Sequence, residues 1–193
     1  MKIAVDIDEV LADLLNQIIL FHNEKYGTNF KRDDFYSYSY HEVWGGTIDQ
    51  AIGKVEEFFD TNYFKETLPI KGALPSLLFL KEKGHDLFLI TGRKYEVEEE
   101  TKNWIEKYFP NIFSGIYHTN TYAPSGIRID KSKVCKELGI SLIIDDDILH
   151  VKDCTGEGVE VLVYDSPWNQ VGLPTGATRV FDWDEIVKII LQK

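Results

Sequence analysis

The strongest constraint on the fold is a unit that occurs three times: an amphipathic helical segment, then glycine, then a short apolar strand. The three units cover residues 77–91, 133–145 and 151–164. Each glycine stands where the end of a helix favours a left-handed residue, and the strands over 87–90 and 142–144 are apolar throughout. Continuous apolar strands joined by helices are typical of a parallel sheet that is covered on both faces. The sequence therefore predicts a doubly wound α/β fold.

Two further strands complete the expected sheet. Residues 3–6 form an apolar strand that ends in acidic residues, and residues 115–119 form another, which gives about five strands in all. In open sheets of this kind, ligands bind beyond the carboxyl ends of the strands. Residues that directly follow a strand are therefore the first candidates for a functional site.

The segment after the first strand breaks this alternation. About 50 residues separate that strand from the next sheet element, which is too long for a simple crossover. The segment is predicted to hold a helix over 10–26, an aromatic stretch over 35–44 and a second helix over 48–59.

We interpret residues 14–67 as a small helical cap that covers the strand ends, and residues 1–13 and 68–193 as the core domain. The aromatic rings over 35–44 either form the cap's own core, which we favour, or stack on a substrate. Trp168 and Asn169 are candidates for closing the far side of the crevice.

The composition narrows the range of partners. Asp and Glu total 32 against 21 Lys and Arg, which gives a net charge of −11 and no basic stripe that would favour polymeric nucleic acid. A small anion stays compatible, because a bound cation and a local lysine reverse the field within a pocket. We expect a cytoplasmic protein without a signal peptide or membrane span, in which Cys135 and Cys154 are reduced.

Acidic residues follow two of the buried strands. Asp6 and Asp8 come at the end of the first strand, and Asp145, Asp146 and Asp147 follow a later one. If these strands are neighbours, the carboxylates converge, and each like-charge pair near 4 Å costs about 4 kcal/mol at an effective dielectric of 20. Mg²⁺, which prefers oxygen ligands, is the natural counter-ion. Helix capping is the alternative role, and we favour the metal site because both clusters occupy equivalent places.

Two other groups stand at corresponding positions. Thr91, Gly92 and Arg93 end an apolar strand and enter a helical segment, which suits phosphate binding by free N–H groups. Lys131 and Lys133 begin the helix that leads to the second acidic cluster. Taken singly, the threonine is more typical of a helix cap and each lysine of a solvated surface, so only the combination points to a site.

In this order along the chain, the residues resemble the four motifs of the haloacid dehalogenase-like phosphohydrolase superfamily. The motifs are Asp6-x-Asp8, Thr91, a lysine at 131 or 133, and Asp145-Asp146. Within the superfamily, the chain is most similar to the 5'(3')-deoxyribonucleotidase group of 5'-nucleotidases, on the segments 6–13, 131–140, 144–147 and 163–169. The resemblance implies a Rossmann-like sheet with a cap, and an Mg²⁺-dependent phosphomonoesterase that acts on (deoxy)nucleoside monophosphates.

The resemblance also implies chemical roles for the acidic residues. Asp6 would be the nucleophile that forms an aspartyl phosphate, and Asp8 would protonate the leaving group and then activate water. Mg²⁺ would be held by Asp6, the backbone carbonyl of Asp8, and Asp145, with Asp146 as a neighbouring or substitute ligand.

The phosphate oxygens would, on the same resemblance, be bound by the Thr91 hydroxyl, by the N–H groups of Gly92 and Arg93, and by Lys131. We prefer Lys131 to Lys133 because it aligns better with the lysine of the family. The partner implied is a small phosphorylated substrate.

Two departures from the nucleotidase group bear on the substrate. Glu9 stands where glycine is usual, and Gly92-Arg93 replaces a small residue that follows the threonine in the mammalian enzymes. A sugar phosphate or another small metabolite is therefore the alternative substrate. A receiver-like signalling module, which also gathers Asp, Thr and Lys around Mg²⁺, is a more remote alternative, because such modules lack a cap and place their lysine last.

Overall fold

A six-stranded parallel sheet forms the centre of the molecule. The computed structural model describes residues 1–121, 123 and 126–193. The strands are hydrogen-bonded in the order β3-β2-β1-β4-β5-β6, and every neighbouring pair is parallel. Their bounds are β1 Lys2–Val5, β2 Asp86–Thr91, β3 Gly115–His118, β4 Leu142–Asp145, β5 Glu160–Tyr164 and β6 Ala177–Val180.

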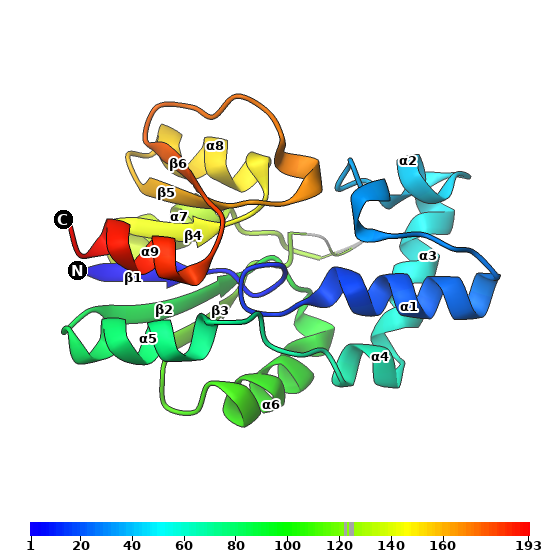
Figure 1. Cartoon of the computed structure of the whole chain (residues 1–193), viewed down its shortest axis with the longest axis horizontal. Helices are drawn as coiled ribbons and strands as arrows, with labels where there is room; N and C mark the ends of the chain where they lie inside the picture. The colour runs from blue at the N-terminus through cyan, green and yellow to red at the C-terminus, as the bar shows by residue number, and fades with distance from the viewer. Residues whose placement is uncertain (122, 124–125) are drawn as a thin grey trace.

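Helices cover both faces of this sheet (Figure 1). Ile3 and Val5 of β1 point into one apolar core, which α5, α6 and α9 complete, whereas Ala4 points into a second core with α7 and α8. This alternation follows from the two-residue repeat of a strand and confirms the predicted doubly wound α/β architecture. The five helices are α5 Ala73–Glu82, α6 Glu98–Tyr108, α7 Lys131–Leu138, α8 Ile148–Gly156 and α9 Trp183–Ile190.

Local sequence signals set the ends of these helices. Gly139 ends α7 at a φ of 69°, a left-handed conformation that glycine adopts without steric cost. The Asp147 and Asp182 side chains accept hydrogen bonds from the first-turn N–H groups of α8 and α9. The helix–glycine–strand units of the sequence therefore fold as units of helix and strand.

The remaining helices form the cap, which extends from one end of the core, opposite both chain termini (Figure 1). Two small apolar clusters hold it together, and the rings of Phe35, Tyr40 and Trp44 pack in them. The cap helices are α1 Leu14–Tyr26, α2 Tyr40–Trp44, α3 Ile48–Phe59 and α4 Asn62–Lys65. The domain boundaries at 14–67 remain a prediction.

Two expectations need correction. The sheet has six strands where about five were expected, because β6 reads Ala-Thr-Arg-Val and only Val180 is fully buried in it. The first cap helix begins at Leu14 instead of residue 10, because the preceding residues fold into a tight loop. In that loop the carbonyl of Ile7 accepts hydrogen bonds from the N–H groups of Val10, Leu11 and Ala12.

Strand order also separates the two classes of fold that gather aspartates around Mg²⁺. Receiver-type sheets have the order 2-1-3-4-5, whereas this sheet has the order 3-2-1-4-5-6 of a Rossmann-like fold. The receiver interpretation is therefore not supported. Within the described ranges, no helix is both long and apolar enough to cross a membrane.

Candidate active site

The candidate site lies where the carboxyl ends of β1 and β4 meet. These strands are neighbours, and the N–H of Asp6 donates to the carbonyl of Ile144 at 3.0 Å. Carboxylate oxygens of Asp6, Asp145 and Asp146 all lie within 4.8 Å of one another, and all three residues are buried. The chain topology thus brings together the two acidic clusters that were identified in the sequence.

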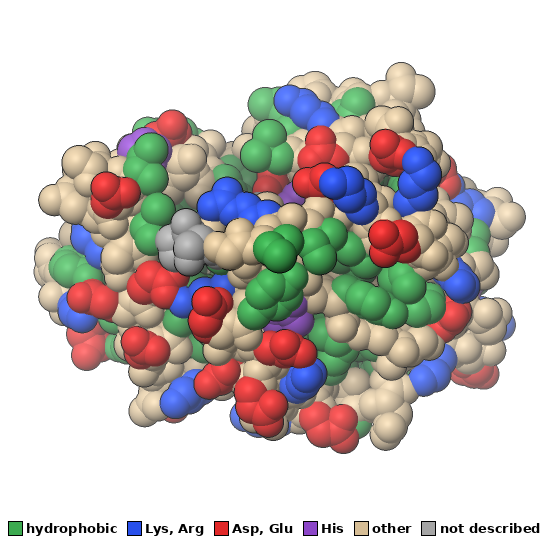
Figure 2. All heavy atoms as spheres, turned by 180° about the vertical axis from the view of Figure 1, so that it is seen from behind, with side chains coloured by type: hydrophobic (Ala, Val, Ile, Leu, Met, Phe, Trp, Pro, Cys, Tyr) green, Lys and Arg blue, Asp and Glu red, His purple; other side chains and the backbone are tan. Residues whose placement is uncertain are grey.

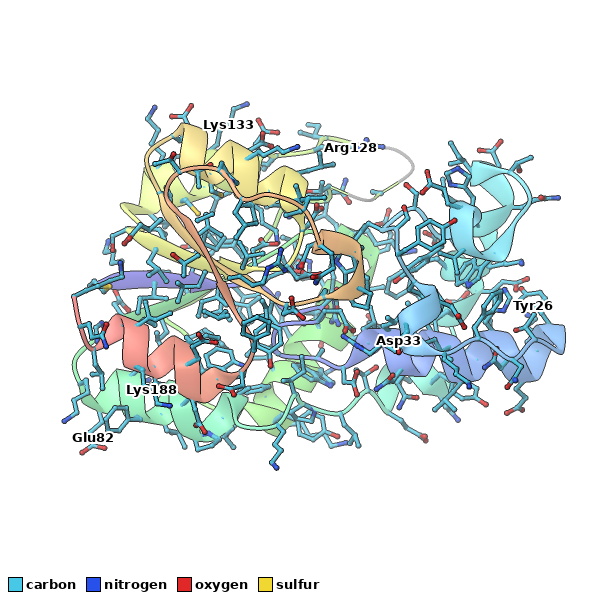
Figure 3. The ribbon with its side chains drawn as sticks, turned by 45° about the horizontal axis from the view of Figure 1, so that its top comes forward. Tyr26, Asp33, Glu82, Arg128, Lys133 and Lys188 are labelled. Atoms are coloured by element: carbon cyan, nitrogen blue, oxygen red, sulfur yellow. The ribbon has the colours of Figure 1, made fainter. Side chains whose placement is uncertain are left out.

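Lys131 is the cation of this centre. Its ammonium group lies 2.9 Å from Asp6 Oδ1 and 2.7 Å from Asp145 Oδ2, and its side chain is only 1% exposed. The Lys133 side chain is 69% exposed and forms an ion pair with Asp130 instead. Figure 3 shows Lys133 at the outer edge of the core, far from the cap. Of the two lysines considered, Lys131 is therefore the one within reach of the site.

The charges of this centre do not balance by themselves. Burial raises the pKa of Asp6 to about 7, with Lys131 opposing and Asp145 adding to the shift. Burial and the neighbouring Asp145 and Asp6 raise the pKa of Asp146. Burial acts in the same sense on Asp145, but Lys131 and then His150 outweigh it and hold the pKa of Asp145 below its usual range.

The donor set fits a divalent cation. Lys131 contacts Asp6 and Asp145, so one ammonium group serves a cluster of three carboxylates, which carries excess negative charge when all three are ionised. Asp146 Oδ1 is buried and has no hydrogen-bond partner among the residues that the structure describes. An oxygen without a partner costs free energy in a buried site unless a proton or cation satisfies it. A hard cation with oxygen ligands meets both needs.

Asp8 faces a different partner. Its carboxylate accepts hydrogen bonds from Arg93 Nη2 at 2.6 Å and from Arg93 Nε at 3.0 and 3.2 Å. The Asp8 side chain is not one of the three that converge on the possible cation site. The two residues of the Asp-x-Asp pair thus have different partners, because Asp6 contacts Lys131 and Asp8 contacts Arg93.

The residues after β2 line the same place. Thr91 is fully buried at the end of the strand, and its hydroxyl accepts a hydrogen bond from the Arg93 N–H at 3.2 Å. Gly92 and Arg93 line the cavity described below. The residues that were expected to bind phosphate are thus gathered near the acidic centre, although one of the expected N–H donors is engaged with Thr91.

Glu9 was missed as a site residue by the sequence analysis. Glu9 is buried and has a backbone φ of 61°. Its carboxylate accepts a hydrogen bond from the N–H of Leu15, in the first turn of α1, and forms an ion pair with Arg32. Arg32 begins a short 3₁₀ helix of the cap, Arg32–Asp34. The signal in the sequence for this link between the loop after β1 and the cap was a Glu at a position where the family usually has glycine.

A cavity of about 380 Å³ lies between core and cap. Its floor includes Asp6 and Asp8, and α1 and α3 of the cap contribute apolar side chains to its wall. Trp168 also lines it, donates from Nε1 to Asp146 Oδ2 at 2.9 Å, and packs edge-on against Tyr38 with 5.7 Å between ring centroids. The rings of the aromatic stretch therefore lie in two environments: some form the cap core, and Tyr38 and Tyr40 line the cavity.

The charge distribution on the surface agrees with a small substrate. On the face shown in Figure 2, Lys and Arg side chains are interspersed with Asp and Glu and form no continuous basic stripe. Such a mixed surface gives little attraction to a polymeric nucleic acid backbone.

Together, the strand order, the inserted cap, and the positions of the aspartates, threonine and lysine after strand ends define a haloacid dehalogenase-like hydrolase. Solved structures agree with this class. A haloacid dehalogenase-like hydrolase from Streptococcus pneumoniae superposes with a TM-score of 0.72 at 14% identity, covering 98% of this chain and 97% of that one. A predicted phosphatase from Clostridium acetobutylicum gives 0.71 at 17% identity, covering 100% and 98%.

The particular family follows from the sequence. The model of the family described as 5' nucleotidase, deoxy (pyrimidine), cytosolic type C protein matches residues 1–193, and the chain belongs to this family. It is similar to a Bacillus cereus protein named "Putative nucleotidase", with 27% identity over 98% of each chain. It is also similar to a 5'(3')-deoxyribonucleotidase of Bacillus subtilis, with 25% identity over 98% of each chain. The protein is therefore a phosphoric monoester hydrolase.

Proposed function

We propose that this protein is an Mg²⁺-dependent 5'-nucleotidase that hydrolyses (deoxy)nucleoside monophosphates through an aspartyl phosphate on Asp6. The observation that carries the proposal is the buried group of Asp6, Asp145 and Asp146 with Lys131, in which Asp6 also lines the cavity between core and cap. Family membership and the Bacillus subtilis relative support a nucleotide as the substrate.

In the first half of the proposed reaction, the Asp6 carboxylate attacks phosphorus and the leaving alcohol takes a proton from Asp8. In the second half, Asp8 takes a proton from water while the water oxygen displaces Asp6 from phosphorus. The Thr91 hydroxyl, the Gly92 and Arg93 N–H groups and Lys131 bind the phosphoryl oxygens during both displacements. Lys131, which contacts Asp6, also keeps the nucleophile in place.

Asp6, the Asp8 carbonyl and Asp145 would hold the metal ion, with Asp146 beside them as an alternative ligand. Mg²⁺ would supply positive charge to the phosphoryl oxygens, in the way that phosphoryl-transfer enzymes commonly use it. One solved relative of the fold, a haloacid dehalogenase-like hydrolase of Bacillus subtilis, is bound to magnesium; it gives a TM-score of 0.66 at 14% identity.

The cap supplies the pocket for the leaving group. Ile48, Ile52 and Val55 of α3 present an apolar wall to the cavity, and Tyr38 and His41 lie across it. A nucleoside has an apolar ring face and polar edges, so a wall of this kind suits it better than it suits a fully hydroxylated sugar.

The test is phosphate release from a panel of deoxyribonucleotides, ribonucleotides and sugar phosphates, with Mg²⁺ and after its removal by chelation. We expect turnover of nucleoside monophosphates only with the metal. Preferred turnover of a sugar phosphate would replace the substrate assignment with the alternative named above, and full activity without a divalent ion would remove the metal from the proposal.

A further inference from the structure

Arg93 is a buried guanidinium that no step of the proposed reaction has yet used through its side chain. It lies two residues after Thr91, at the start of the segment that follows β2, and its side chain is 3% exposed. A buried cation of this kind requires close partners, because the loss of hydration is costly. The identity of those partners indicates what the residue does.

The partners of Arg93 fix it from three sides. Nε and Nη2 donate to the two oxygens of Asp8, and Nη1 donates to Thr101 Oγ1 of α6 at 3.1 Å. The guanidinium carbon also lies 5.0 Å from the centre of the Phe64 ring, in the cap. A planar guanidinium that binds both oxygens of a carboxylate sets the rotation of that carboxylate as well as its position.

This arrangement leaves one side of Asp8 free for chemistry. The Asp8 side chain is 19% exposed and lines the cavity, while its partner is enclosed. In the second half of the reaction Asp8 acts as a carboxylate, and the two-point contact with Arg93 holds it in one orientation for that step. Oδ1 accepts two of the hydrogen bonds from Arg93, whereas Oδ2 accepts one and retains a second acceptor site.

We propose that Arg93 is a positioning residue that aims the Asp8 carboxylate at the water which hydrolyses the aspartyl phosphate. The step is the second half of the reaction: the water oxygen forms a bond to phosphorus, the bond between phosphorus and Asp6 breaks, and one water proton passes to Asp8. This inference rests on the proposed function. It assigns the Arg93 side chain to Asp8, whereas the N–H of the same residue is the group expected at phosphate.

The two half-reactions can be separated with p-nitrophenyl phosphate, because its leaving group departs without a proton. Formation of the aspartyl phosphate then needs no acid, whereas its hydrolysis still needs the base. In Arg93→Met, we expect the first nitrophenolate release per active site at nearly the wild-type rate, followed by steady turnover about 10- to 100-fold slower than in the wild-type protein. Intact-protein mass should show one added phosphoryl group in the variant during turnover.

Two further variants sharpen the test. Thr101→Val removes the third hydrogen bond of the same guanidinium but leaves its pair with Asp8, so steady turnover should change by less than about threefold. Adding Arg93→Met to Asp8→Asn should cost little beyond Asp8→Asn alone, since a residue that acts through Asp8 has nothing left to position. If Arg93→Met fails to fold, the same two rates are measured in Arg93→Lys, which keeps the charge but loses the two-point contact with the Asp8 carboxylate.

Two results would overturn the inference. One is an equal slowing of the first release and of steady turnover. The other concerns affinity in Arg93→Met. If inorganic phosphate, as an inhibitor, and the substrate lose affinity for this variant by the same factor, the Arg93 side chain is a phosphate ligand. A wild-type protein that hydrolyses no phosphomonoester would refute the proposed function itself, which is a separate outcome.

Discussion

The core and the cap contribute different things to the same cavity. The core supplies charged groups at strand ends, and each is held by a buried contact such as the one between Lys131 and Asp145. The cap supplies mainly apolar and aromatic side chains, several of them partly exposed, from α1, α3 and the segment before α2. On the proposed function, we therefore expect the chemical step to depend on the core and the choice of leaving group to depend on the cap.

Three of the contacts that join these two regions involve neighbours of Asp8 or Asp146. The cap residue Arg32 forms an ion pair with Glu9 of the loop after β1, Phe64 lies against Arg93, and Tyr38 packs against Trp168. Each core member of these contacts is adjacent to Asp8 in sequence or touches Asp8 or Asp146. A change in the cap can therefore reach the acidic centre through a single side chain.

The largest effect should come from the nucleophile in the core. Asp6→Asn keeps the shape of the side chain but makes it a poor nucleophile, so turnover should fall by about 10⁴-fold or more. Phosphate release under saturating substrate measures it, and circular dichroism checks that the fold is intact. Asp182→Asn is the control, since Asp182 only caps α9 and its replacement should leave turnover unchanged. Near-normal activity in Asp6→Asn would contradict the assignment of the chemical step to the core.

The second largest effect should come from removal of the buried Lys131 ammonium group. Lys131→Met leaves Asp6, Asp145 and Asp146 without an ammonium group, which should destabilise the metal-free protein by about 3–5 kcal/mol. Urea unfolding measures this, and Mg²⁺ should restore more stability to the variant than to the wild-type protein. Lys133→Met serves as the matched control and should change neither stability nor activity, because Lys133 is exposed. Equal effects of the two variants would rule out a special role for Lys131.

A change in the cap wall should act on binding alone. Ile52→Asp places a charge on the apolar face of α3 that lines the cavity, so KM for a nucleoside monophosphate should rise about tenfold, or about 1.4 kcal/mol. Turnover of acetyl phosphate, whose leaving group is too small to need this wall, should stay within about twofold of the wild-type value.

The control for this variant is Leu20→Asp. Leu20 is exposed on α1 and does not line the cavity, so the same new charge there should leave both substrates unaffected. A fall in turnover of acetyl phosphate in Ile52→Asp would show that cap and chemistry are not separable in this way.

A last effect, outside the active site, concerns the stability of the cap at low pH. Burial, and then the nearby Lys54, lower the pKa of His22 to about 4 from its usual 6.5. Between these values the unfolded chain binds a proton at His22 and the folded chain does not, so stability falls as pH falls, by up to about 1.4 kcal/mol per pH unit. Urea unfolding between about pH 4 and 7 should show this slope of the unfolding free energy against pH, and His22→Gln should lose it. An identical slope in the two proteins would place its origin elsewhere.

The carboxylates of the core were predictable because they follow short strands whose apolar residues are continuous. Asp6 and Asp145 needed only the rule that parallel strands end at one edge of the sheet. The partner of Asp8 was not predictable in this way, since Arg93 lies far along the chain and was expected to use its N–H at phosphate. Glu9 was noticed only as a departure from the family, because its contacts with Leu15 and Arg32 depend on the fold of the loop.

The elements that were missed share a physical cause. β6 lies at the edge of the sheet, so its residues are only partly buried and show no apolar run. The tight loop before α1 is apolar at Val10 and Leu11, which reads as helix, but these residues pack into the core instead. In both cases tertiary contacts decide a conformation that local pattern leaves open.

The place of β1 in the middle of the sheet has a consequence for how the protein is made. A ribosome releases the N-terminus first, so this apolar strand and Asp6 emerge before either flanking strand exists. A chain that stalls before α7 carries Asp6, the proposed nucleophile, without Lys131 or the second acidic cluster. On the proposed mechanism, competence for hydrolysis therefore arrives only late in synthesis.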